Sequence, residues 1–248
     1  MNPSPRTLDQ VDLTGRTVLL RVDFNVPLDG ETVTDDTRIR MALPTIREVL
    51  RKADKVVLMS HLGRPKDAPD ARYSLIPAAA RLAELLDGEV LFLHDTIGDE
   101  AQRLIKDAPA GSVILLENLR FFPGEKKNDA SFASALAALG DAYVDDAFGT
   151  MHRGEASILG VPRLLEVSCV GRLVQREVEA LGRLLGATDR PYAAVVGGAK
   201  VSDKIDVLDR LAQRVDHLFL GGAMAYTFLA AQGVATGSSR VESESIET

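Results

Sequence analysis

The sequence has a single cysteine, Cys169, among 248 residues, which excludes an intramolecular disulfide framework. It lacks any apolar run that approaches the ~18–20 residues of a membrane span, and its first residues, MNPSPR, lack the apolar segment of a secretory signal. Basic residues are the minority, with 29 Lys and Arg against 36 Asp and Glu and a net charge of −7, so broad attraction to nucleic acid or anionic membrane is disfavoured. These absences predict a cytoplasmic protein in a reducing compartment, with no nucleic-acid or membrane partner.

What is present is an alternation of short β-rich runs and helix-like stretches. Several runs are continuously apolar, which is typical of strands buried on both faces of a parallel sheet. The predicted strands are residues 17–22, 55–60, 90–93, 112–116, 142–144, 192–196 and 217–220, and predicted helices include residues 74–86 and 131–139. This order predicts an α/β fold, with an open parallel sheet covered by helices.

An amphipathic segment divides the chain. Residues 171–186 carry apolar side chains on one helical face, which predicts a helix of about four turns with Gly186 as its C-cap. We therefore expect a first domain at 1–171, a connecting helix region at 172–190 and a second domain at 191–248. Two predicted strands cannot form a self-sufficient sheet, and the polar tail at 233–248 offers no closing element, so the second domain is predicted to be incomplete.

Charged side chains follow the predicted strands of the first domain. Ligands of open α/β sheets bind beyond the carboxyl ends of the strands, and each charged hydrogen bond to a phosphate or carboxylate is worth ~1.5–3 kcal/mol. The basic residues expected at this edge are Arg38, His61, Arg64, Arg120, His152 and Arg153. They predict a site for a small, highly charged anion; the alternative is a set of solvated loop residues. Asp23 and Asn25 precede them and, alone, would be read as turn caps.

The second domain carries two strand-to-glycine turns. The segment 197–205, GGAKVSDKI, joins a strand to a lysine-bearing helix start, where backbone amides and lysine charge suit a phosphate chain. Gly221 and Gly222 repeat the turn one unit later, where a flat base could lie on bare backbone. Neither turn matches a Walker A loop or a G-x-G-x-x-G fingerprint. Tight strand–helix turns without a ligand are an equally good interpretation.

Seven motifs together resemble the phosphoglycerate kinase family from about Leu13 onward. They are RVDFNVP (21–27), TRIR (37–40), SHLGRP (60–65), ENLRF (117–121), DDAFGTMHR (145–153), GGAKVSDKI (197–205) and LGGAMAYTF (220–228). The resemblance implies two Rossmann-like three-layer lobes with parallel sheets, the second incomplete in this chain. It implies a glycolytic and gluconeogenic kinase that moves a phosphoryl group reversibly between ATP and the carboxylate of 3-phosphoglycerate, giving 1,3-bisphosphoglycerate and ADP. A monomer is expected when the protein is complete.

The resemblance also assigns roles to residues. Asp23 and Asn25 are similar to the residues that contact the glycerate hydroxyl and carboxyl end, and Arg38 and Lys200 to those at the transferring phosphoryl group. The 3-phosphate is expected on His61, Arg64, Arg120 and Arg153, with Phe24, Leu62 and Gly63 completing the substrate-binding set. The nucleotide is expected on Lys200, Lys204, Gly197, Gly198, Ala199, Gly221 and Gly222. Mg²⁺ is implied together with ATP or ADP; no metal ligand is expected in this chain, because the family's aspartate ligand belongs to a downstream segment.

The implied chemistry needs no general base. The nucleophile in the ATP-consuming direction is a carboxylate, which is ionised near neutral pH. Catalysis is then positioning plus charge stabilisation of an in-line transfer, with closure of the two lobes to exclude water.

The chain departs from the family pattern in two ways. Met151 replaces an alanine, and Gly154-Glu155 replaces an Ala-His pair, which places a carboxylate near the basic patch. The family's G-G-G-D segment also has no counterpart. The sequence is therefore expected to be inactive alone, as the N-terminal portion of an ordinary phosphoglycerate kinase. The alternative is a truncated, non-catalytic form that binds 3-phosphoglycerate or a protein partner only.

Overall fold

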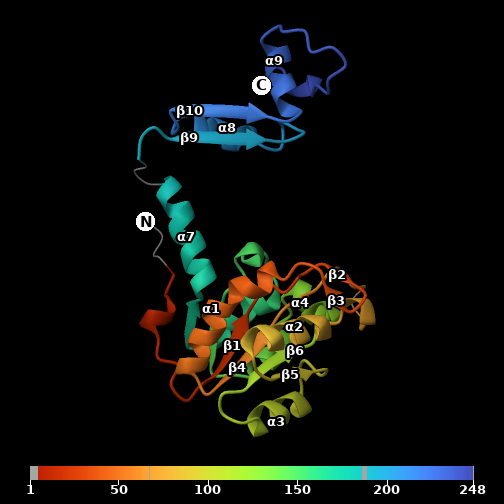
Figure 1. Cartoon of the computed structure of the whole chain (residues 1–248), viewed down its shortest axis with the longest axis vertical. Coiled ribbons are helices and arrows are strands. Elements are labelled where there is room, and N and C mark those ends of the chain that lie inside the picture. The colour runs from red at the N-terminus through yellow and green to blue at the C-terminus, as the bar shows by residue number, and fades with distance from the viewer. Residues whose placement is uncertain (1–4, 67, 186–188, 248) are drawn as a thin grey trace. The chain divides into compact units, whose positions relative to one another are not determined.

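The computed structural model describes residues 5–66, 68–185 and 189–247, and the chain forms two compact units, Met1–Ala180 and Leu181–Thr248 (Figure 1). The boundary falls inside helix α7 (Arg172–Leu185). That helix matches the amphipathic segment predicted at 171–186, although its expected cap, Gly186, lies outside the described residues.

A six-stranded parallel sheet forms the centre of the first unit. In spatial order its strands are β5 (Val90–Leu93), β6 (Val113–Leu116), β4 (Lys55–Met59), β1 (Thr17–Arg21), β7 (Ala142–Asp145) and β8 (Val167–Val170). The sequence predicts the first five to within two residues at each end, and the α/β class is confirmed. It misses β8, whose short run VSCV contains a serine and a cysteine and so lacks the continuous apolar pattern of its neighbours.

Alternate residues of the central strands feed two separate cores, because successive side chains of a strand point to opposite faces. Val18 and Leu20 belong to one cluster, and Leu19 belongs to the other. The first cluster is closed by α1 (Thr37–Lys52) and α2 (Ile76–Leu86), and the second by α3 (Asp99–Asp107), α5 (Ala130–Ala137) and α6 (Val161–Leu164). The unit thus has the three layers, helices–sheet–helices, that the sequence predicts.

Short elements fill the connections. They are the hairpin β2 (Leu28–Asp29) and β3 (Thr32–Val33), helix α4 (Pro123–Lys127), the π-helix η5 (Ala156–Gly160) and the 3-10 turns η1 (Leu8–Gln10), η2 (Ala71–Tyr73), η3 (Leu119–Phe121) and η4 (Phe148–Thr150). The sequence does not predict the hairpin, although its Asp29-Gly30 pair is a known turn signal.

The start of α7 is fixed to the first unit by charge. The Arg172 guanidinium donates to Asp9 Oδ1 at 2.6 Å and to Glu48 Oε2 at 2.6 Å. The buried Asp146, in the loop after β7, accepts from the backbone amides of Leu173 and Val174 at 2.9 and 3.3 Å. The loop that follows β7 therefore caps this helix.

The second unit is small. Its parallel strands β9 (Ala193–Gly197) and β10 (His217–Gly221) pair with each other, and α8 (Ile205–Ala212), α9 (Met224–Ala231) and the turn η6 (Ser243–Ser245) complete it. Both strands agree with the prediction to within one residue. The tail is more ordered than expected, because Glu242 bonds back to the loop that precedes α8.

None of the helices in the described part of the chain combines the length and apolarity required to cross a membrane.

Candidate functional site

Four loops of the first unit meet at one edge of the sheet. They follow β1, β4, β6 and β7, which lie side by side and run parallel, and they are called the strand-end loops: residues 22–27, 60–65, 117–121 and 146–154. Parallel strands bring their carboxyl ends to the same edge. The structure therefore brings together the loops that carry every first-domain site residue predicted from the sequence except Arg38, which contributes from the first turn of α1.

Asn118 ties these loops together. Its Oδ1 accepts from the backbone amides of Leu62 and Arg120, both at 3.1 Å, and its Nδ2 donates to the carbonyls of Leu62 and Tyr73 at 2.8 and 2.9 Å. The side chain is fully buried, so all its hydrogen-bonding capacity is used inside the protein. Asn118 thus fixes the backbone from which Arg120 projects.

Gly63 has a conformation that other residues rarely adopt. Its φ is +60°, and a Cβ here would come within 2.4 Å of the Tyr73 ring. Its amide donates to Asn25 Oδ1 at 2.8 Å, and its carbonyl accepts from Arg120 Nη1 at 2.9 Å. The glycine therefore allows three of the strand-end loops to approach closely.

Arg38 is held by a carboxylate at the site. Its Nη1 donates to Asp23 Oδ2 at 2.7 Å, while Asp23 Oδ1 accepts from the Asn25 amide at 3.2 Å. The Arg38 side chain is half exposed, at 50%. Asp23 and Asn25 therefore form a turn, as the simpler interpretation of the sequence has it, and this turn also orients Arg38 toward solvent-accessible space.

His61 lies beneath the site as a neutral ring. It is 1% exposed, and burial together with the nearby Arg21, Arg120 and Arg38 guanidiniums lowers its pKa to about 2. Arg21 Nη2 lies 3.1 Å from His61 Nδ1. Since arginine only donates, Nδ1 accepts and the ring proton sits on Nε2. His61 therefore offers one N–H donor, without the positive charge that a basic patch would imply.

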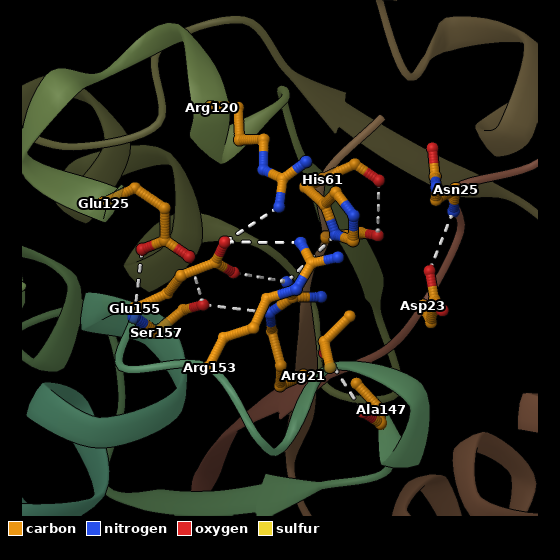
Figure 2. Close-up of polar contacts among 12 residues, drawn as sticks. Arg21, Asp23, Asn25, His61, Arg120, Glu125, Ala147, Arg153, Glu155 and Ser157 are labelled. Atoms are coloured by element: carbon orange, nitrogen blue, oxygen red, sulfur yellow. Dashed lines mark hydrogen bonds and ion pairs between the residues drawn. The ribbon is translucent and has the colours of Figure 1, made fainter. Parts of the chain in front are cut away.

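Glu155 lies among the arginines (Figure 2). Its Oε1 accepts from Arg120 Nη2 at 2.8 Å and from Arg153 Nη1 at 3.4 Å, and its Oε2 lies 3.9 Å from Arg21 Nη2. The sequence-based expectation of a carboxylate near the basic patch is confirmed.

Two residues of the predicted substrate set have their side chains in the core. Phe24 is fully buried and Leu62 is 4% exposed, and both belong to the first hydrophobic cluster. Only their backbone can face a ligand, and the Phe24 amide already donates to Ser60 Oγ at 2.9 Å. Arg64, in contrast, is exposed.

Behind the site lies a buried polar group that is not predicted from the sequence. Arg21 is fully buried at the end of β1, and its Nε donates to Ser157 Oγ at 2.9 Å. Ser157 Oγ in turn donates to Glu125 Oε1 at 2.5 Å, and burial raises the pKa of that carboxyl. Burial likewise raises the pKa of Asp145. The sequence feature that could have indicated Arg21 is its place as a charged residue at the end of an otherwise apolar strand.

In the second unit the two glycine turns pack against each other. Gly222 has φ +69°, and a Cβ there would come within 2.8 Å of the Gly198 carbonyl oxygen. The Gly198 carbonyl accepts from the Met224 amide at 2.9 Å. This contact gives Gly198 and Gly222 a packing role. Their role beside a nucleotide, like that of Gly197, Ala199 and Gly221, stays a prediction.

The amides at the predicted phosphate-binding turn bind a carboxylate. Glu242 Oε2 accepts from the amides of Val201 and Ser202 at 2.8 and 3.0 Å, and Glu242 Oε1 accepts from Ser202 Oγ at 2.6 Å. These contacts lower the pKa of Glu242 to about 2. The turn thus binds an anionic group, as its motif suggests, and here the group belongs to the chain. Lys200 is exposed and Lys204 is half-buried beside it.

Within the described ranges, no group of three or more His, Cys, Asp or Glu side chains is placed to hold a metal ion. The acidic residues of the site are instead engaged by arginine, serine or backbone amides.

Comparisons with known proteins agree with this geometry. Residues 8–248 match the family model described as phosphoglycerate kinase. Proteins named phosphoglycerate kinase from Anaeromyxobacter sp. (strain K) and Rhodopirellula baltica are 55% identical over 245 residues and 52% identical over 246 residues, each over 98% of this chain. The chain spans 62% of the length of each of these relatives.

Solved structures give the same result. The phosphoglycerate kinase from Coxiella burnetii matches with a TM-score of 0.88 and 39% identity, over 98% of this chain and 61% of that one. The enzyme from Pyrococcus horikoshii OT3 matches with a TM-score of 0.80 and 34% identity, over 94% of this chain and 59% of that one. The motifs at the strand-end loops, the family model and these relatives lead to one conclusion: the chain belongs to the phosphoglycerate kinase family.

Proposed function

We propose that this chain supplies the 3-phosphoglycerate-binding lobe, and part of the nucleotide-binding lobe, of a phosphoglycerate kinase. The reaction is reversible phosphoryl transfer between ATP and the carboxylate of 3-phosphoglycerate, giving 1,3-bisphosphoglycerate and ADP. The observation that carries the proposal is the convergence of Arg38, Arg64, Arg120 and Arg153 at one sheet edge in an acidic protein. Such a cluster suits a small anion with two charged ends.

The 3-phosphate is assigned to the part of the site built by Arg64, Arg120, Arg153 and His61. Guanidinium groups bind phosphate oxygens in a bidentate manner and remain charged throughout the working pH range. His61 contributes as a neutral donor through Nε2–H, which follows from its lowered pKa and from the Arg21 contact at Nδ1. Two of these donors, His61 and Arg120, are buried, where hydrogen bonds to a charged group are strongest.

The glycerate end is assigned to Asp23, Asn25 and Arg38. The attacking carboxylate is already ionised, so these residues have to orient it and stabilise charge, without removing a proton. Asp23 holds the Arg38 guanidinium at 2.7 Å, which supports a role for Arg38 at the transferring phosphoryl group. Lys200 is assigned to the same group and Lys204 to the nucleotide phosphates, with Gly197, Gly198, Ala199, Gly221 and Gly222 beside the nucleoside.

Mg²⁺ is proposed to accompany ATP or ADP, where it would neutralise phosphate charge. The protein groups named above are assigned to substrate binding and orientation. The phosphoglycerate kinase proposed here works in the cytoplasm on these small molecules, as a monomer.

Titration calorimetry of the 248-residue chain with 3-phosphoglycerate tests the proposal. Arg64 is exposed, so Arg64→Ala can remove one guanidinium without opening the core. Loss of one charged hydrogen bond costs ~1.5–3 kcal/mol, so the affinity is expected to fall by about 10- to 100-fold.

Arg163→Ala is the matched control, because Arg163 is an exposed arginine of α6, outside the strand-end loops. It is expected to bind like the wild type. Equal affinities of the wild-type and Arg64→Ala chains, or equal losses in the two variants, would contradict the assignment.

A further inference from the structure

Glu155 is a buried carboxylate inside a site assigned to an anion. It is 6% exposed, and it is ion-paired to two of the four arginines assigned to the substrate, Arg120 at 2.8 Å and Arg153 at 3.4 Å (Figure 2). The donor nearest to it, Arg120 Nη2, is among the groups that a phosphate oxygen would need. Glu155 therefore occupies donors that are assigned to the substrate phosphate.

Hydrogen bonding in this pair is incomplete. Among the described residues, Glu155 Oε2 and Arg120 Nε are both buried without a hydrogen-bond partner. A permanent structural ion pair is normally satisfied at every buried polar atom, because an unpaired charged group is costly. Each side chain of the Arg120–Glu155 pair thus has one polar atom that another group, such as a ligand, could still satisfy.

Glu155 is ion-paired to three guanidiniums. Arg21, Arg120 and Arg153 surround it, while burial raises the pKa of Glu125 and of Asp145 and so disfavours their ionised forms. Glu155 shares its single carboxylate among the three guanidiniums. A phosphomonoester dianion would bring more charge and oxygens enough for several donors.

We propose that Glu155 is an internal competitor for the phosphate site: it occupies the Arg120 and Arg153 guanidiniums in the free protein and is displaced, or opposes binding by repulsion, when a phosphomonoester arrives. Glu155 thereby sets the affinity of the site for the substrate phosphate. The inference rests on the proposed function, since it takes 3-phosphoglycerate as the ligand.

A positioning role for Glu155 makes the opposite prediction. If Glu155 served only to hold Arg120 and Arg153 in place for the phosphate, its neutralisation would loosen both guanidiniums and weaken binding. A competitor, in contrast, releases them when it is neutralised. The sign of the change in affinity therefore separates the two roles.

The test compares the wild-type chain with Glu155→Gln, which keeps the shape of the side chain and an oxygen acceptor but removes the charge. Calorimetry is carried out with 3-phosphoglycerate and, separately, with inorganic phosphate. We expect Glu155→Gln to bind both about 10- to 100-fold more tightly. Glu166→Gln is the control for net charge, because Glu166 is exposed outside the strand-end loops, and it is expected to bind like the wild type.

Neutralising a buried counter-ion can destabilise the fold, so two further measurements accompany the first. Phosphate is expected to raise the Tm of Glu155→Gln more than that of the wild type, because tighter binding stabilises the folded state more. Glu155→Asp retains the charge but withdraws it by one methylene, and its phosphate affinity is expected to lie between those of the wild type and Glu155→Gln.

Each outcome bears on one proposal or the other. If the wild type binds 3-phosphoglycerate and both Glu155 variants bind equally or more weakly, the competitor role is wrong and the proposed function stands. If Glu155→Gln gains affinity for inorganic phosphate but neither protein binds 3-phosphoglycerate, the competitor role stands for phosphate and the proposed function is wrong. Absence of binding to either anion in all the variants overturns both.

Discussion

His61 shows how the environment of a residue changes the role that its identity suggests. As a member of a basic motif it is expected to bring charge to a phosphate site. Burial and three neighbouring guanidiniums lower its pKa to about 2, so the ring is neutral at any physiological pH. His61 therefore adds a directional donor to the site and no positive charge.

His61 is accordingly expected to show no titration between pH 5.5 and 8, with Nε2 protonated and Nδ1 acting as an acceptor. Long-range ¹H–¹⁵N NMR of the imidazole nitrogens checks this, and His61→Gln identifies the signal by its disappearance. Because its pKa in the folded state lies below the usual value of 6.5, the neutral ring contributes stability that is present above pH 6.5 and is lost as the pH falls toward 2. A His61 titration midpoint near 6.5 would contradict the buried, arginine-flanked ring.

At the scale of single residues, part of the site was predictable. The charged residues after each apolar run could be placed at one edge, because parallel strands must end together. The partners of Arg21 could not be predicted, since Arg21 and Ser157 are 136 positions apart in the sequence. Only the folded loops bring the two side chains into contact. The burial of Phe24 could not be predicted for the same reason: its motif indicates a loop, whereas its side chain packs in the hydrophobic core.

At the scale of elements, α7 is joined to the site through Asp146. This residue belongs to the same loop as Arg153, and its carboxylate caps the first turn of α7. Burial raises the pKa of Asp146 to about 7, against hydrogen bonds that lower it. The helix at the unit boundary thus begins on a carboxyl group that takes up a proton near neutral pH.

Asp146 should therefore make the stability of the first unit depend on pH. The folded state holds a proton up to about pH 7, whereas the unfolded state releases it near 3.8. The stabilisation is complete below pH 3.8 and is lost as the pH rises through 7, with a slope of up to ~1.4 kcal/mol per pH unit. Asp146→Asn keeps an oxygen acceptor for the helix amides but lacks this titration.

Urea unfolding followed by far-ultraviolet circular dichroism between pH 5 and 8 measures the effect. The free energy of unfolding of Asp146→Asn is expected to rise relative to that of the wild type as the pH increases. Asp107→Asn, which alters an exposed carboxylate at the end of α3, should follow the wild type. Parallel pH profiles for wild type and Asp146→Asn would show that the carboxyl is ionised throughout.

The elements themselves were predicted where the hydrophobic pattern was continuous. β6 is an uninterrupted apolar run, β1 and β4 each contain one, and the positions of all three agree with the sequence-based ranges. β8 was not predicted because Ser168 and Cys169 interrupt its apolar pattern. Its pairing with β7 supplies the stability that its composition does not. Tertiary pairing of this kind leaves no local signal.

At the scale of the whole molecule, the two units differ in how much apolar surface they bury. The strands of the first unit's sheet are flanked by two hydrophobic clusters, and β4 is buried along its full length. In the second unit the described cluster has three buried members, Val201, Leu208 and Met224, and β9 alternates between half-buried and exposed positions. Because burial of apolar surface is the main source of stability, the second unit is expected to open more readily.

Hydrogen exchange of the intact 248-residue chain, read by mass spectrometry, tests this difference. Amides of β9 and β10 are expected to exchange faster than those of β1, β4 and β7, although all five strands are paired in parallel ladders. Addition of 3-phosphoglycerate should slow exchange in the strand-end loops and leave β9 and β10 unchanged, because the groups assigned to that ligand all belong to the first unit. Exchange in β9 and β10 as slow as in β4 would mean that the small cluster stabilises the second unit as well as the large clusters stabilise the first. Protection of β9 by 3-phosphoglycerate alone would mean that this ligand's influence extends beyond the unit that carries its proposed site.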